Sequence, residues 1–242
     1  MIRPIAALLM VLLPWAARAQ SVSLDLGSGG DAGATSRLVQ LTALITVLSL
    51  APGLAVMTTA FTRIVIVLSL LRSALGTQGT PPNMVLIGLS LFLTYFVMQP
   101  VFEQSWTLGI QPMTDGRIGE IEGLRLAAEP FRGFMAANIK ADDLSFFEDL
   151  AHLPAQGADQ ASWRALVPAF MVGELRRAFE MGFLLFLPFL VIDLVVGSVL
   201  MSLGMMMLPP NAVSLPFKLI FFVLADGWRL VAGSLVRSFA GG

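Results

Sequence analysis

The sequence predicts an all-α membrane protein built from broken helical hairpins, with about four apolar segments and a small helical insertion. Of its 242 residues, 56% are hydrophobic and only 13% are charged. A soluble domain of this length has about a quarter of its residues charged. The apolar segments are interrupted by proline or carry single charges, which suits helices that pack against protein rather than lipid.

Two residue types that carry much of enzyme chemistry are scarce. The chain has no cysteine, and its one histidine, His152, lies in a polar, loop-like stretch. This excludes disulfides and thiolate chemistry, and it argues against a three-histidine zinc site or a Ser-His-Asp triad. The net charge of −1 argues against a nucleic-acid partner. We therefore expect no catalytic activity, no cofactor and no metal.

Residues 1–19 have the pattern of a cleavable signal peptide. Arg3 supplies the early positive charge, Ile5 to Leu13 form a short apolar core, and Ala17-Arg18-Ala19 precede Gln20. We expect cleavage between Ala19 and Gln20. A first transmembrane helix is the alternative, but the apolar core is shorter than the roughly 20 residues that a span needs. Residues 20–37 are rich in Gly, Ser and Asp and predict a flexible lead-in.

Residues 38–102 predict the first helical hairpin. A shorter apolar helix, 38–50, is separated by Pro52-Gly53 from a span over 54–71. A polar Gly/Pro turn leads to a second span over 84–102.

Residues 103–165 differ in composition, because they hold most of the acidic residues and few basic ones. We expect a small, water-facing helical domain. Arg63 and Arg72 flank the first turn, which the positive-inside rule places in the cytoplasm. The acidic domain then faces the periplasm, in agreement with an exported N-terminus.

Residues 166–242 predict the second hairpin, with spans over about 182–203 and 213–236. The connection between them reads SLGMMMLPP, from Ser202 to Pro210. Glycine and proline favour a loop here rather than a continued helix. The loop carries three consecutive methionines, Met205, Met206 and Met207.

The charges of this hairpin suggest ion pairs. Spacings of three and four predict local pairs of Glu174 with Arg177 and of Arg176 with Glu180. Asp226 and Arg229, three apart, can also satisfy each other.

Two further charges stand alone in apolar sequence. Asp193 needs a partner, protonation or water. Lys218 needs a carboxylate as its partner, and Glu174 and Asp193 are the candidates, either in the same chain or in a neighbouring subunit. Alternatively, the Lys218 amine reaches the membrane interface. We expect Asp193, Asp226 and Arg229 to be buried charges.

Three aromatic residues follow at helical spacing, Phe179, Phe183 and Phe186. They predict an aromatic packing face along one side of the helix.

Four blocks of the sequence resemble the FliP family of flagellar biosynthetic proteins, which includes the export-gate subunits of virulence injectisomes. The blocks are FTRIVIVLSLLRSALGTQGTPPN, PAFMVGELRRAFEMGF, LPFLVIDLVVGSVLMSLGMMMLPP and PFKLIFFVLADGW. The resemblance runs from about Leu38 to the C-terminus and is weaker in the acidic domain. Two positions depart from the family pattern: Gly173, where serine is usual, and Ser73, where asparagine is common.

The resemblance implies a core subunit of the type III protein export gate in the bacterial inner membrane, at the flagellar basal body. Several copies, about five, assemble with FliQ and FliR into a helical funnel through which unfolded export substrates pass. The family has no catalytic activity. By motif match, Met205, Met206 and Met207 form the seal of the pore, and Glu174 pairs with Lys218 of a neighbouring copy. The signal peptide favours the flagellar branch over the injectisome branch.

Two other functions fit parts of the sequence. A secondary transporter or proton channel would explain broken helices and buried charges, although no inverted repeat is visible. An intramembrane aspartyl protease would need Asp193 and Asp226 to share a proton, but Arg229 lies one helical turn from Asp226 and would keep it ionised. Without the resemblance, the three methionines would be read as apolar residues at a helix end.

Overall fold

The structure is a computed structural model that describes residues 41–42, 45–46, 49–50, 52–77, 79–205 and 207–240. The predicted signal peptide with its cleavage site at Ala19 and Gln20, and the lead-in over 20–37, lie outside the described residues. The chain divides into two units, residues 1–49 and 50–242, and every element below belongs to the second. Among the described residues all regular structure is helical, as the sequence predicts.

The first apolar segment of this unit is sharply bent. A helix over Pro52–Thr58 and α3, Phe61–Leu75, meet at an angle of 81°. The segment predicted as a span over 54–71 is therefore a bent pair of helices, and the break falls at Thr59-Ala60 rather than at Pro52-Gly53. The Thr62 hydroxyl donates to the Val56 carbonyl at 2.8 Å, which satisfies a backbone group that the bend leaves without its helical partner. Proline at position 52 only begins a helix, where it is tolerated.

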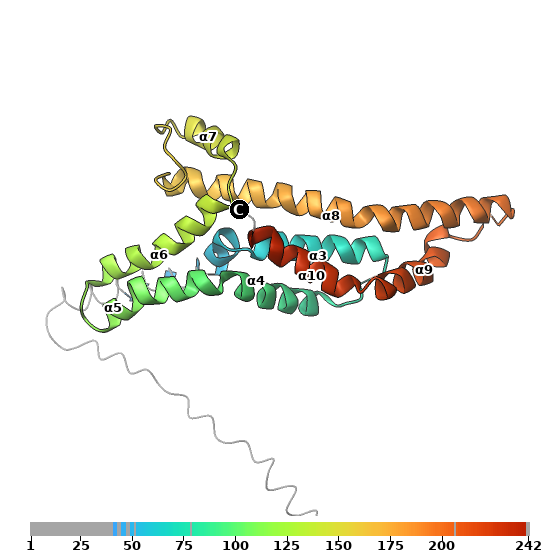
Figure 1. Cartoon of the computed structure of the whole chain (residues 1–242), viewed down its shortest axis with the longest axis horizontal. Helices are drawn as coiled ribbons and strands as arrows, with labels where there is room; N and C mark the ends of the chain where they lie inside the picture. Colours follow the sequence, from blue (N-terminus) through green and yellow to red (C-terminus); the bar gives the residue numbers. More distant parts are fainter. Residues whose placement is uncertain are drawn as a thin grey trace, which may run out of the picture. The chain divides into compact units, whose positions relative to one another are not determined.

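The second apolar segment extends beyond its predicted end at residue 102. The segments α4 (Asn83–Ser105), the π-helical turn η1 (Trp106–Ile110) and α5 (Gln111–Thr114) follow one another as a continuous helix of 32 residues. The chain then reverses into α6, Glu120–Ala137, which packs back along η1 and α4 (Figure 1). A side chain at Gly109 would collide with the backbone of Gly123 and Ala127, so glycine is what allows this close approach.

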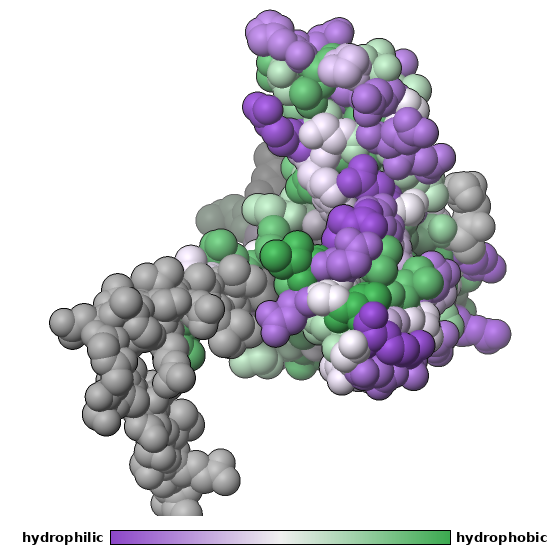
Figure 2. Space-filling view, turned by 90° about the vertical axis from the view of Figure 1, so that its left-hand side faces the viewer, coloured by the Kyte–Doolittle hydropathy of each residue, from purple (hydrophilic) through white to green (hydrophobic). Residues whose placement is uncertain are grey.

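Helix α7, Ala141–Leu150, completes the predicted insertion and packs against the start of α8. The insertion shares a buried cluster of its own with α8, separate from the main core, which includes Met135, Leu144, Leu166 and Phe170. Figure 2 views the end of the unit that carries α5, α6 and α7 and shows many hydrophilic residues there, beside smaller hydrophobic patches. This distribution agrees with a helical insertion that faces water.

The third segment, α8, is a single helix of 40 residues, Trp163–Ser202. It begins 19 residues before the predicted span over 182–203, and neither Pro168 nor Pro188 interrupts it. The Ser162 side chain accepts a hydrogen bond from the Arg164 amide and caps its first turn. At a rise of about 1.5 Å per residue the helix is roughly 60 Å long, about twice the hydrocarbon thickness of a bilayer.

The last segment is also broken. Helix α9, Pro210–Leu224, and α10, Gly227–Ala240, meet at 63°, so the segment predicted as a span over 213–236 is a bent pair of helices. Asp226 lies at the break with a φ of 50°, in the left-handed region that aspartate tolerates better than most residues. Among the residues that the structure describes, two helices are long and apolar enough to cross a membrane, and up to four spans result if each bent pair counts as one. The prediction of about four apolar segments fits this count.

Helix α3 lies at the centre of the main core. Its residues Ile64, Val67, Leu68 and Leu71 are almost completely buried. It packs most extensively against α8, and α4 also lies against it (Figure 1). Gly182 of α8 makes this contact close, because a side chain there would collide with Leu70. The most apolar 18-residue stretch of α8 remains largely uncovered, since only 11% of it is buried.

Candidate functional site

The methionine-rich loop connects α8 to α9. Gly204, with a φ of 71°, ends α8 in the left-handed conformation that glycine favours. The Met205 amide donates back to the Leu200 carbonyl at 3.0 Å, and Pro209 precedes α9. Met205 is 44% exposed and Met207 is 98% exposed, whereas Met206 lies outside the described residues. The loop therefore presents the apolar, flexible side chain of Met207 almost fully uncovered, with Met205 partly exposed beside it.

A buried polar network joins the two helices beside this loop. Lys218 of α9 donates to Asp193 of α8 at 2.6 Å and to the Ala74 carbonyl at the end of α3 at 3.1 Å. Ser214 donates to the other oxygen of Asp193 at 2.5 Å. Of the two carboxylates left open as partners of Lys218, the structure selects Asp193. Lys218 is only 5% exposed, so its amine does not reach toward the surface of this chain.

A second buried ion pair joins α3 to α8. The Arg63 Nε donates to Glu174 at 2.8 Å, and its Nη2 donates to the second oxygen of the same carboxylate. The Arg63 Nη1 donates to the backbone carbonyl and the hydroxyl of Ser238 on α10 at 3.0 and 2.8 Å. The guanidinium also stacks over the Phe239 ring, 3.7 Å from its centroid. Arg63 therefore connects three helices, a role that the sequence analysis missed because it used this residue only to orient the chain.

The predicted pair of Glu174 and Lys218 concerns two copies of the chain. Within one chain, Glu174 is fully buried against Arg63, and Lys218 is held by Asp193. Arg177 approaches Glu174 only to 4.0 Å, so the predicted local pair is a weak one. The pairing between copies stays a prediction, and it would require these internal partners to be shared or exchanged.

The other local pair that the sequence predicts, Arg176 with Glu180, does not form. Arg176 instead makes two contacts with Asp143 of α7, at 3.0 and 2.6 Å, and so ties the insertion to α8. Tertiary packing brings a second carboxylate closer than the one four residues along the helix. Glu180 is exposed and makes no hydrogen bond or ion pair among the described residues, although it acts on Arg176 at longer range.

The ion pair of Asp226 and Arg229 forms, with 3.7 Å between its closest atoms. Its predicted burial is wrong within this chain, since the two side chains are 64% and 87% exposed. The pair lies at the break between α9 and α10, where the bend turns both side chains away from the core. Asp193, whose side chain is 24% exposed, is partly buried.

The predicted aromatic face is divided. Phe186 is half-buried and packs against the main core, but Phe179 and Phe183 are 59% and 63% exposed. Two of the three rings therefore lie on the outer surface of α8, uncovered by the described residues.

Neither a metal site nor a carboxylate dyad is found in the described part of the chain. No group of three or more His, Cys, Asp or Glu side chains lies close enough there to hold a metal ion. The two carboxylates that an aspartyl protease would use have separate cationic partners, Lys218 for Asp193 and Arg229 for Asp226. The arrangement in the described part of the chain combines the buried pairs Arg63–Glu174 and Lys218–Asp193, which fix helices, with an apolar loop at one end.

Comparison of the sequence with known proteins finds relatives that all carry the same name. A flagellar biosynthetic protein FliP from Caulobacter vibrioides is 57% identical over 240 residues, which cover 98% of this chain and 90% of that protein. The protein of the same name from Agrobacterium fabrum is 48% identical, over 99% of this chain and 100% of that protein. The one from Bacillus subtilis is 46% identical, over 89% and 98% respectively. The family model FliP matches residues 44–235. The chain belongs to the FliP family of flagellar biosynthetic proteins.

Proposed function

We propose that this chain is the core pore-forming subunit of the flagellar type III protein export gate, and that it passes unfolded flagellar proteins across the bacterial inner membrane. The FliP family membership supports the flagellar role. About five copies, together with FliQ and FliR, would form the closed ring around the pore. The observation that carries the proposal is the exposed methionine loop at the end of a hairpin that a buried ion pair fixes.

A gate for unfolded chains must block ions when it is closed and admit side chains of every shape when it is open. A hydrophobic constriction blocks ions by excluding water. Methionine is apolar and unbranched, so it repacks around irregular partners. Met207 is 98% exposed and Met205 is 44% exposed, so both present apolar surface that the chain leaves uncovered. With Met206, one such loop from each copy would form a deformable seal.

The rest of the hairpin supports assembly with other chains. Helix α8 has most of its apolar surface uncovered and is far longer than one membrane crossing requires. Exposed charges lie among apolar residues at the break between α9 and α10. Charges are costly in hydrocarbon, and an apolar helix longer than the bilayer leaves apolar surface in water. Neighbouring subunits that cover these faces would remove both costs.

Ion conductance of the reconstituted gate tests the seal. Replacing Met205, Met206 and Met207 with alanine should raise the leak of the closed gate, because alanine leaves a wider and less hydrophobic constriction. Met57 and Met84 provide a matched control, since they are 44% and 80% exposed but lie outside the loop. Their replacement with alanine should leave the leak unchanged. A closed-state leak that does not rise in the triple variant would refute the seal.

Two experiments distinguish the alternatives: complementation in a flagellated cell, and isolation of the complex in gentle detergent. An injectisome subunit would support secretion but not flagellar assembly when it replaces the native protein in a flagellated cell. A secondary transporter or proton channel would be isolated in gentle detergent without a ring-like complex. The proposed function predicts a ring that contains several copies of this chain.

A further inference from the structure

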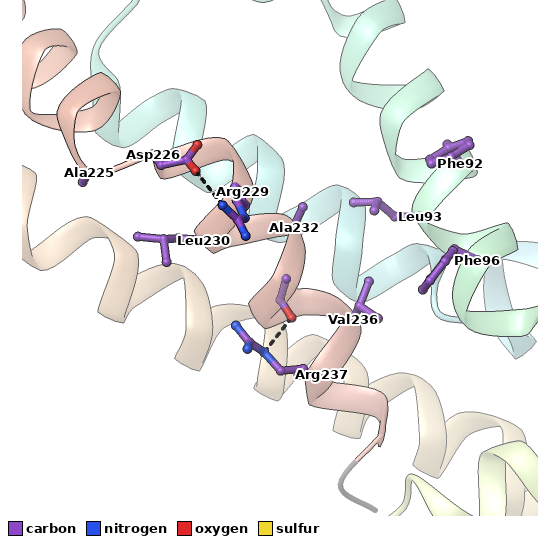
Figure 3. A pocket seen from close by; sticks show the side chains of 11 residues that line it. Phe92, Leu93, Phe96, Ala225, Asp226, Arg229, Leu230, Ala232, Val236 and Arg237 are labelled. Carbon is purple, nitrogen blue, oxygen red and sulfur yellow. Dashed lines mark hydrogen bonds and ion pairs between the residues drawn. The ribbon is translucent and has the colours of Figure 1, made fainter.

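Helix α9 lies between two breaks in the chain. Before it, Gly204 has a φ of 71°, and the methionine loop separates α9 from α8. After it, Asp226 has a φ of 50°, and α9 meets α10 at 63°. Figure 3 shows this second break from close by, with Asp226 facing Arg229 across their ion pair. Hinges in proteins are a few residues at the ends of such elements, so α9 has a candidate hinge at each end.

The second break borders open space. Ala225 and Asp226 line a groove of about 750 Å³, and Phe92 and Phe96 of α4 line its opposite side (Figure 3). The side chains of Asp226 and Arg229 are mostly exposed, and their closest atoms are 3.7 Å apart. On the side of the groove, the described residues therefore do not clamp the junction of α9 and α10.

Few side chains attach α9 to the rest of the chain. All of its 15 residues are described, and three of them are buried: Ser214, Lys218 and Phe222. Successive spacings of four place them in one stripe along the helix. Phe222 is the only residue of α9 in the main core, and it lies next to the second break. Apolar core packing therefore secures α9 only at the end that joins α10.

The two polar residues of this stripe converge on one carboxylate. Ser214 donates to one oxygen of Asp193 at 2.5 Å, and Lys218 donates to the other at 2.6 Å. Lys218 also donates to the Ala74 carbonyl at 3.1 Å, which ties α9 to the end of α3. We call Asp193, Ser214 and Lys218 the latch. Hydrogen bonds weaken steeply with distance and misalignment, so the latch holds α9 in one position and breaks when α9 moves.

Beside the latch, α8 and α9 leave a gap between them. A cavity of about 470 Å³ lies there, and all its lining side chains are apolar. Val195 and Val199 line it from α8, and Val213 and Phe217 line it from α9. It extends to Leu200, whose carbonyl accepts the amide of Met205 in the loop. Side chains that line a void lack partner atoms on one side, so packing holds this half of α9 only weakly.

We propose that α9 is a hinged lid, which turns about the break at Asp226 and carries the methionine loop into and out of the pore constriction. The latch holds the closed position. Because the loop is joined directly to the first residue of α9, it moves with the helix. At about 1.5 Å per residue α9 is about 22 Å long, so a turn of about 15° moves its first residue by about 6 Å. This inference rests on the proposed function and specifies which part of the chain moves.

An engineered disulfide tests the movement, because the chain has no cysteine of its own. A Cβ atom added at Gly197 of α8 would lie 4.0 Å from the Cβ of Pro210, the first residue of α9. Disulfides join Cβ atoms that are roughly 3.5–4.5 Å apart. Gly197→Cys and Pro210→Cys are introduced together into flagellated cells that lack their own family member, and export of flagellar proteins is measured before and after oxidation. Oxidation should lower export by about tenfold or more, because the lid can no longer turn, and a reductant should restore it.

Two controls separate a locked lid from damage by the oxidant. Each single cysteine variant should export equally before and after oxidation. The double variant joined by a long, flexible bis-maleimide should keep its export, because a long tether lets α9 turn. Equal losses with the disulfide and the long tether would overturn the proposal.

Undiminished export would also overturn it, when all thiols are lost without a dimer band and the disulfide is therefore within one chain. Either result leaves the proposed function standing, because the reduced variant still exports. Failure of the unmodified chain to restore export in these cells would instead overturn the proposed function, and the lid with it.

The latch provides a second readout that needs no cysteine. Ser214→Ala removes one of the two contacts with Asp193 and should raise the ion leak of the closed, reconstituted gate several-fold, because the closed position becomes less favoured. Ser198→Ala is the matched control, since Ser198 is exposed on α8 and its hydroxyl donates to the Val195 carbonyl of its own helix. An equal leak in the two variants would overturn the latch as the element that holds the lid closed.

Discussion

Arg63 and Glu174 lie 111 positions apart in the sequence and form a fully buried, two-point ion pair. The contact joins α3 to α8, and through Ser238 it also fixes the end of α10. Bidentate geometry satisfies both carboxylate oxygens and leaves neither charge exposed. The pair therefore sets how the two central helices lie against each other.

Removal of either member should destabilise the chain strongly. Arg63→Met or Glu174→Leu leaves one buried charge without its partner, which costs about 3–5 kcal/mol. The double variant should be less destabilised than the sum of the two, since no unpaired charge remains. Thermal unfolding of the protein in detergent measures this. Arg125→Met, which breaks an exposed pair with Glu122, serves as the control and should leave the midpoint unchanged. Strictly additive single effects would show that the two side chains do not interact.

Rescue experiments distinguish the internal pairs from the pairing between copies. Glu174→Lys should abolish assembly, because it places two cations in a buried site. If the carboxylate acts within its own chain, Arg63→Glu restores assembly and Lys218→Glu does not. If Glu174 pairs with Lys218 of a neighbour, Lys218→Glu restores it. The amount of intact complex on a native gel gives the answer, and the geometry of the single chain predicts rescue by Arg63→Glu.

The network at Asp193 should show a graded response. Asp193→Asn leaves Lys218 in a buried site without a counter-charge and should lower the thermal midpoint clearly. Ser214→Ala removes one hydrogen bond, worth about 1 kcal/mol, and should have a smaller effect. Asp193→Asn with Lys218→Met should recover part of the loss. An Asp193→Asn protein of normal stability that no longer conducts protons would instead support a proton channel.

Two glycines of the same continuous helix should respond in opposite ways to alanine. Gly109→Ala introduces a side chain where the backbone of α6 lies, so it should separate α6 from η1 and destabilise the insertion. Gly88 has nothing within 4 Å of the position of an added side chain. Gly88→Ala should therefore be neutral or stabilising by up to about 1 kcal/mol, from helix propensity alone. Limited proteolysis between α5 and α6 reports the difference, and equal cleavage in both variants would contradict the close approach.

The sequence predicts the apolar segments and the loop more accurately than the breaks. Glycine and proline correctly mark the loop at Gly204, because they act locally on the backbone. The break at Thr59-Ala60 is missed, because a threonine side chain satisfies the backbone there and no proline marks it. Conversely, Pro188 suggests a break that α8 does not have. In apolar helices, neighbouring helices can satisfy the groups that proline frees.

Ion pairs between distant segments are the least predictable feature. The pair of Asp226 and Arg229 is local and forms as expected. The partner of Lys218 could be narrowed to two carboxylates, since few charges are present in the apolar segments. Arg63 and Asp143 were not assigned, because their partners come from helices whose packing the sequence does not specify. The exposure of the aromatic side chains is unpredictable for the same reason, because whether Phe179 or Phe186 faces the core depends on where α3 lies.

The central claim is that the methionine loop contacts the chain that is being exported. A photo-reactive residue at position 207, in cells where a substrate is stalled in the gate, measures this contact. We expect a covalent adduct between this chain and the substrate. The same residue at position 224, which is also apolar and 82% exposed but lies at the end of α9, should give none. An adduct of equal yield at both positions, or no adduct at position 207 with a stalled substrate present, would contradict the account.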